Sequence, residues 1–150
     1  MHTSTRRHLI ASLLMALTTI STYPAFAEQP ENITIQGTYT WKVGSPANSK
    51  PKQPDFWWQH KSKTESFWNP RSGASAAIVK KSFEAITASD AMAVKLSNKP
   101  IAGHLLAEGT VLVFKTSEGK LGKMTVVGFD PLPGSDGTRN YNIKLRWQWL

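Results

Sequence analysis

The chain has 150 residues and no cysteine. Its 18 lysines and arginines outnumber its 10 aspartates and glutamates, which gives a formal net charge of +8. Without cysteine, disulfide bonds, thiolate zinc sites and cysteine nucleophiles are all excluded. The length fits one domain with an ordinary hydrophobic core. The positive charge favours polyanionic partners, or it simply keeps the protein soluble.

Residues 1–27 have the features of a cleaved signal peptide. Arg6 and Arg7 form a basic start, an apolar run extends from Leu9 to Ile20, and Ala25-Phe26-Ala27 is a small-x-small cleavage site. The apolar run is shorter than the ~20 residues of a membrane-spanning helix. The adjacent arginines also fit a twin-arginine export signal.

We therefore predict an exported protein, periplasmic or secreted, with a single domain at residues 28–150 and no transmembrane segment after cleavage. The lack of cysteine in an exported chain is more typical of a bacterium than of a eukaryotic secretory pathway. Cleavage removes two arginines and no acidic residue, so the remaining domain keeps a net charge of +6.

Alternating apolar residues open this domain. Ile33, Ile35, Tyr39, Trp41 and Val43 all occupy odd positions, which predicts a half-buried strand over 33–43 that bends at the glycine at position 37. The segment 44–54 follows with three prolines and no apolar residue larger than alanine, and we expect an exposed loop there.

Five large aromatic residues and three basic residues lie between positions 56 and 71, with no clear strand or helix period. Tryptophan rings stack on sugars while lysine and arginine hold anions, so this aromatic-basic segment is a candidate binding platform. Alternatively, the rings fold inward and complete the core. Trp57 and Trp58 point to opposite sides if the chain is extended. The candidate ligand-binding residues are Phe56, Trp57, Trp58, His60, Lys61, Trp68 and Arg71.

We predict the main helix over Ser75 to about Thr87. Ser75 is a suitable N-cap, and Val79, Phe83 and Ile86 follow the i, i+4, i+7 spacing of one buried face. A second, short helical turn is predicted from Ser89 to about Val94.

The C-terminal part predicts an antiparallel meander. Residues 110–116 and 121–129 are rich in β-branched and aromatic side chains and flank a glycine-containing turn, and apolar and polar residues alternate from 141 to 149. Lys144 and Arg146 share the polar face of the last strand, either as a polyanion-binding surface or as an ordinary solvated face.

These elements together predict an α+β fold. We expect a small antiparallel β-sheet, made of the C-terminal three-stranded meander plus the N-terminal strand, with one main helix packed on it.

No catalytic or cofactor motif occurs in residues 28–150, and we predict no cofactor and no metal site. His60 and His104 are the only histidines there, too few for a zinc site without carboxylates, and the loop from Asp130 to Asp136 lacks a calcium-loop pattern. His60 could still act as an acid-base group or ligand near neutral pH. A pair of carboxylates across a cleft would leave no sequence signal. The open candidates for such a pair are Asp55, Glu65, Glu84, Glu108 and Glu118.

We therefore predict a non-catalytic binding protein rather than an enzyme. Its aromatic-basic segment would contact an anionic polymer, a glycan or a lipid surface of the cell envelope, and nucleic acid is not an expected partner of an exported protein. One alternative is an inhibitor or assembly subunit that binds another exported protein. Another is a small cell-wall hydrolase.

Overall fold

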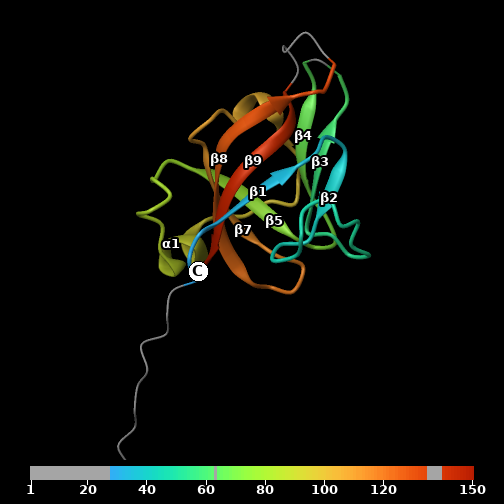
Figure 1. The fold of residues 1–150 in the computed structure, drawn as a ribbon. Helices are drawn as coiled ribbons and strands as arrows, with labels where there is room; N and C mark the ends of the chain where they lie inside the picture. The colour runs from blue at the N-terminus through green and yellow to red at the C-terminus, as the bar shows by residue number, and fades with distance from the viewer. Residues whose placement is uncertain (1–27, 63, 135–139) are drawn as a thin grey trace, which may run out of the picture.

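The computed structural model of the protein describes residues 28–62, 64–134 and 140–150 (Figure 1). The predicted signal peptide and Asp136 of the C-terminal loop lie outside these residues. In the described part of the chain, no helix is long and apolar enough to cross a membrane. The elements are β1 (Glu31–Ile35), β2 (Tyr39–Trp41), β3 (Phe56–His60), β4 (Ser66–Pro70), β5 (Ser75–Val79), α1 (Ala88–Ala93), β6 (Ile101–Ala102), the 3-10 turn η1 (Gly103–Leu105), β7 (Val111–Lys115), β8 (Leu121–Pro131) and β9 (Asn140–Trp149).

The strands form two antiparallel sheets that share one core. Five strands make the first sheet in the order β1-β9-β8-β7-β5, and four make the second in the order β2-β3-β4-β6. Aromatic rings join the sheets: the ring centroids of Phe56 and Phe114 are 5.8 Å apart, and those of Trp41 and Trp147 are 5.7 Å apart. Both faces of this contact are apolar because alternate residues of each strand point inward.

The predicted N-terminal strand is divided between the two sheets. The alternation is confirmed, because Ile35, Trp41 and Val43 are buried. However, β1 pairs with β9 whereas β2 pairs with β3. The chain turns at Gly37, where an added Cβ would lie 2.4 Å from the ring of Tyr141. Only glycine allows such a close approach between backbone and ring.

The predicted main helix over residues 75–87 is wrong. Ser75–Val79 forms β5, which pairs with β7 along its whole length. Phe83 and Ile86 are buried, but they belong to an irregular segment that covers the outer face of the five-stranded sheet. The i, i+4, i+7 spacing of apolar residues also occurs in an irregular segment with one buried side. For Ser75–Val79, pairing with β7 outweighs the local preference for a helix.

The second predicted helical turn is confirmed as α1. Thr87 caps it, since the Asp90 amide donates to the Thr87 hydroxyl and the Asp90 carboxylate accepts from the Thr87 amide. α1 is the only α-helix of the described residues, of which 44% are in strands and 8% are helical. The predicted α+β fold of one sheet under one main helix is therefore corrected to a mostly β fold with two sheets.

The predicted C-terminal meander is confirmed. β7 pairs with β8 in the register Val111↔Thr125 to Lys115↔Leu121, and β8 pairs with β9 with a register shift between Val126 and Gly128. Side chains of β7 are buried on both faces of the sheet, with Leu112 and Phe114 in the main core and Val111 and Val113 in the second one.

Candidate functional site

The aromatic-basic segment forms the β3–β4 hairpin at the centre of the four-stranded sheet, and the two faces of that hairpin separate the candidate residues. Phe56, Trp58 and Trp68 point into the core and are at most 1% exposed. Phe56 stacks on Trp68 at 5.0 Å, and the Trp58 indole N–H donates to the Tyr141 carbonyl at 2.8 Å. These three residues support the fold and are not accessible to a ligand.

The opposite face of the hairpin carries two aromatic rings, each beneath a cation. The Arg71 guanidinium lies 5.4 Å from the centre of the half-buried Trp57 ring, and the Lys61 ammonium lies 5.0 Å from that of the half-buried Phe67 ring. Trp57 opposes Asn69 and Phe67 opposes Gln59, so the two rings are diagonal neighbours. We call Trp57, Lys61, Phe67 and Arg71 the outer aromatic-basic row.

Backbone and amide hydrogen bonds hold this row in place. Asn69 is 9% exposed, and its side-chain amide nitrogen lies 3.3 Å from the carbonyls of Trp57 and of Phe67, to which it donates. The Arg71 amide donates to the Asp55 carbonyl at 2.8 Å. In the described part of the chain, the Arg71 guanidinium forms no salt bridge, whereas the Lys61 ammonium lies 4.0 Å from Glu65. The Arg71 charge is therefore available to an external anion.

His60 lies apart from this row, in a small polar cavity of about 200 Å³ that also receives His104. The cavity forms because β4 pairs with β6, which places η1 beside Ser66. Hydroxyl groups and the two imidazoles supply its polar lining, and the His60 ring contacts Tyr141 at 5.5 Å. No sequence signal links the two histidines, because only the strand pairing brings them together. Across the described residues, no group of three or more His, Cys, Asp or Glu side chains is placed to hold a metal ion.

Asp55, the most buried of the candidate carboxylates, connects the two sheets. It is 1% exposed and accepts hydrogen bonds from the Val43 amide at 3.0 Å and from the amide and hydroxyl of Ser117 at 2.8 Å each. These contacts join the end of β2, the start of β3 and the turn between β7 and β8. Asp55 therefore has a structural role that its sequence position does not indicate.

The other carboxylate candidates are on the surface, and most of them pair with basic side chains. Glu118 binds Lys42 at 2.6 Å, which lowers the pKa of the Glu118 carboxyl. Glu84 and Glu65 lie 3.1 Å and 4.0 Å from their cations, and Glu108 is exposed.

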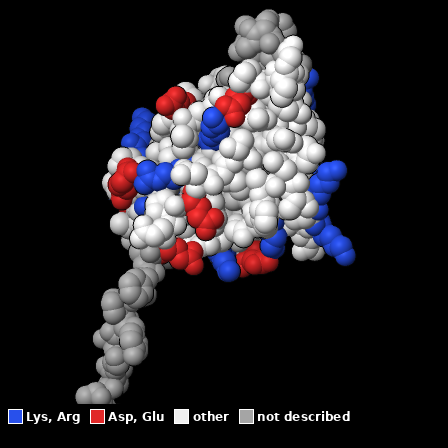
Figure 2. All heavy atoms as spheres, viewed as in Figure 1, with Lys and Arg blue, Asp and Glu red and all other residues white. Residues whose placement is uncertain are grey.

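The basic face of the last strand is largely neutralised by acidic residues. Lys144 binds Asp130 at 2.7 Å, and Arg146 binds Glu84 while its guanidinium lies 4.5 Å from the Phe83 ring. Figure 2 shows basic and acidic side chains interspersed over one side of the molecule, without an extended patch of one sign. This arrangement favours the solvated-face interpretation of Lys144 and Arg146.

Comparison of the chain with models of known protein families, with curated proteins and with solved structures finds no match. The functional assignment therefore depends on the geometry of the surface described above.

Proposed function

We propose that this chain is an exported, non-catalytic binding protein whose outer aromatic-basic row holds an extended anionic polymer of the cell envelope. The observation that supports this most directly is the division of the β3–β4 hairpin. Three rings of the aromatic-basic segment form core, while Trp57 and Phe67 face outward, each beside a cation.

The placement of two cations along one face of the hairpin suits a polymer with repeated negative charges. Lys61 directly follows β3, whereas Arg71 directly follows β4 and is hydrogen-bonded to Asp55 at the other end of the hairpin. With ~3.3 Å per residue along a strand, the Cα atoms of the two residues are about 20 Å apart, and their side chains reach toward each other over the diagonally placed Phe67 and Trp57 rings. The two cations therefore follow one face of the hairpin, where successive units of an anionic chain can contact both.

The chemistry of Arg71 favours an acidic ligand over a neutral sugar. A guanidinium stacked on an aromatic ring keeps its N–H groups available for bidentate bonds to carboxylate or phosphate. A neutral sugar that stacks on Trp57 has to compete with Arg71 for the same ring face, whereas an anion binds Arg71 where it stands.

The test is a titration of the purified protein with polygalacturonate, with neutral dextran and with anionic lipid vesicles, followed by tryptophan fluorescence. We compare Trp57→Ala and Arg71→Gln with Lys80→Gln, which removes the same charge from an exposed residue outside the row. We expect Arg71→Gln to weaken polygalacturonate binding on the order of tenfold, Lys80→Gln to have little effect, and added salt to weaken binding of the wild type.

Equal losses in Arg71→Gln and Lys80→Gln would contradict the proposal, because binding would then follow net charge only. Stronger binding of dextran than of polygalacturonate would contradict the preference for anions. If no polymer or vesicle binds and one exported protein copurifies in a fixed ratio, the inhibitor or assembly-subunit hypothesis replaces it.

A further inference from the structure

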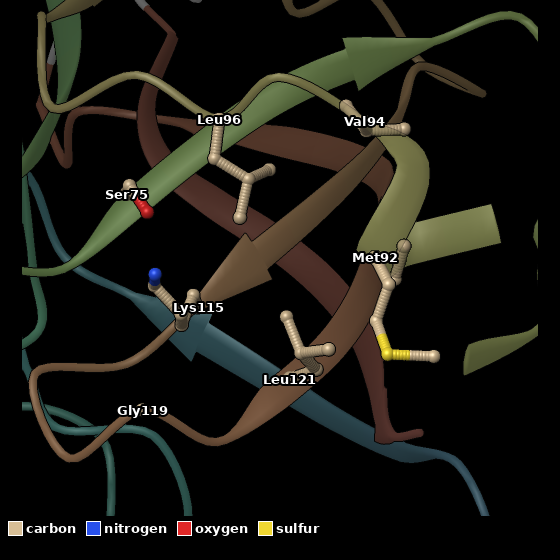
Figure 3. A pocket seen from close by; sticks show the side chains of 8 residues that line it. Ser75, Met92, Val94, Leu96, Lys115, Gly119 and Leu121 are labelled. Carbon is tan, nitrogen blue, oxygen red and sulfur yellow. The ribbon is translucent and has the colours of Figure 1, made fainter. Parts of the chain in front are cut away.

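A second concave site lies on the face of the five-stranded sheet that points away from the four-stranded sheet (Figure 3). Its volume is about 360 Å³, within the range of small-molecule sites. Its floor is one row of neighbouring residues across three strands, Ser75 of β5, Lys115 of β7 and Leu121 of β8. It is separate from the outer aromatic-basic row, so the two sites are testable independently.

The cavity exists because the irregular segment that carries Phe83 and Ile86 does not extend over the row of Lys115. Val111 and Val113 lie under Phe83 and Ile86 in the second core. The next residue of β7 on the same face is Lys115, and neither Phe83 nor Ile86 lines the cavity above it. α1 and the chain after it form a wall at the side of this row and leave an open space above it (Figure 3).

The wall of the cavity is aliphatic. α1 contributes Ala91 and Met92, and the following chain contributes Val94 and Leu96. Figure 3 shows the side chains of Leu96 and Leu121 pointing toward the open space, with Met92 at its edge. No aromatic residue of the described chain lines it, so it lacks the ring faces on which sugars stack.

One end of this aliphatic cavity carries a cation and a hydroxyl group. Lys115 pairs with Ser75 across β7 and β5, and Figure 3 shows both side chains on the same side of the cavity. Within the described residues, Lys115 has no salt-bridge partner. An unpaired ammonium beside a chain of aliphatic side chains complements a carboxylate that ends an alkyl chain.

We propose that this cavity binds a straight-chain aliphatic carboxylate, a fatty acid, with its carboxylate at Lys115 and Ser75 and its alkyl chain along Leu121, Leu96 and Met92. Met92 is 69% exposed, and its flexible thioether adapts to alkyl chains of different lengths at the open rim. Burial of this exposed side chain would add to the apolar contact.

The first test is calorimetric titration of the purified protein with hexanoate, octanoate, decanoate and decanol, below their aggregation concentrations. We expect affinity to rise by roughly fourfold for each added methylene until the cavity is full. Decanoate should bind on the order of tenfold more tightly than decanol. Lys115→Met should abolish this preference for the carboxylate. Lys95→Met, which removes an exposed charge between Val94 and Leu96 but outside the cavity, should preserve it.

The second test locates the bound chain by nuclear magnetic resonance of the methionine methyl groups. Decanoate should shift the Met92 signal saturably and leave the signal of Met124, which is 0% exposed in the main core, unchanged. No shift of Met92, or an equal preference for the carboxylate in wild type and Lys115→Met, would overturn the proposal. Equal affinity for a decyl-trimethylammonium ion would also overturn it, because the site would then bind alkyl chains of either charge.

Discussion

Asp55 offers the sharpest test of how the two sheets are joined. Its buried carboxylate accepts three hydrogen bonds, from the Val43 amide, the Ser117 amide and the Ser117 hydroxyl. Asp55→Ala leaves two backbone N–H groups without their acceptor, each at a cost of ~1–3 kcal/mol, and loses the bond from the hydroxyl as well. We therefore expect the free energy of unfolding to fall by ~3–5 kcal/mol.

Asp55→Asn separates the loss of the acceptor from the loss of volume. The amide oxygen still accepts from Ser117, but an NH₂ group then faces the Val43 N–H, so we expect a loss of ~2 kcal/mol. Asp130→Asn is the matched control, because its salt bridge to Lys144 is on the surface, with 40% of the Asp130 side chain exposed. Such a bridge contributes less than ~1 kcal/mol.

The assay is urea unfolding followed by the fluorescence of the core tryptophans. With a slope of ~1–3 kcal/mol per molar urea, Asp55→Ala should lower the midpoint by more than ~1 M. The order of stability should be wild type, Asp130→Asn, Asp55→Asn and then Asp55→Ala. If both Asp55 variants unfold at the same urea concentration as Asp130→Asn, Asp55 does not join the sheets, and its role as a functional carboxylate has to be considered again.

Two further predictions concern β8. Gly122→Ala should lower the free energy of unfolding by ~1–3 kcal/mol, because the new Cβ would lie 2.2 Å from the Phe114 ring. Gly128→Ala, with nothing within 4 Å of its Cβ, should be neutral or slightly stabilising. Similar thermal midpoints for both variants would contradict the packing argument. Burial lowers the pKa of Lys123 below 10.5, so the unfolded state binds more protons between the folded pKa and 10.5, and the free energy of unfolding contributed by this residue rises with pH over that interval. Lys123→Met should remove that rise, and identical pH profiles for wild type and variant in urea unfolding would refute it.

The sequence indicated which segment contains the candidate site but only some of the residues that form it. The aromatic and basic residues alone mark the segment 56–71 as unusual. Because successive side chains of a strand point to opposite faces, Trp57 and Trp58 are expected on opposite sides. Which of the two rings points inward depends on the apolar face of the opposite sheet, and Phe67 emerges as a surface residue only from the pairing of β3 with β4. The His60 and His104 cavity and the Lys115 cavity leave no sequence signal, because strands distant in the chain assemble them.

The sequence by itself determined the features that depend on near neighbours. The alternation in residues 33–43 and 141–149 and the turn between β7 and β8 follow from side-chain period and glycine, all within a few residues of chain. Tertiary structure alone decided that residues 75–79 form a strand, that the N-terminal strand divides between two sheets, and that the rings of Phe56, Trp58 and Trp68 fill the core. Each of these depends on a partner far along the chain, and burial against that partner outweighs the local conformational preference.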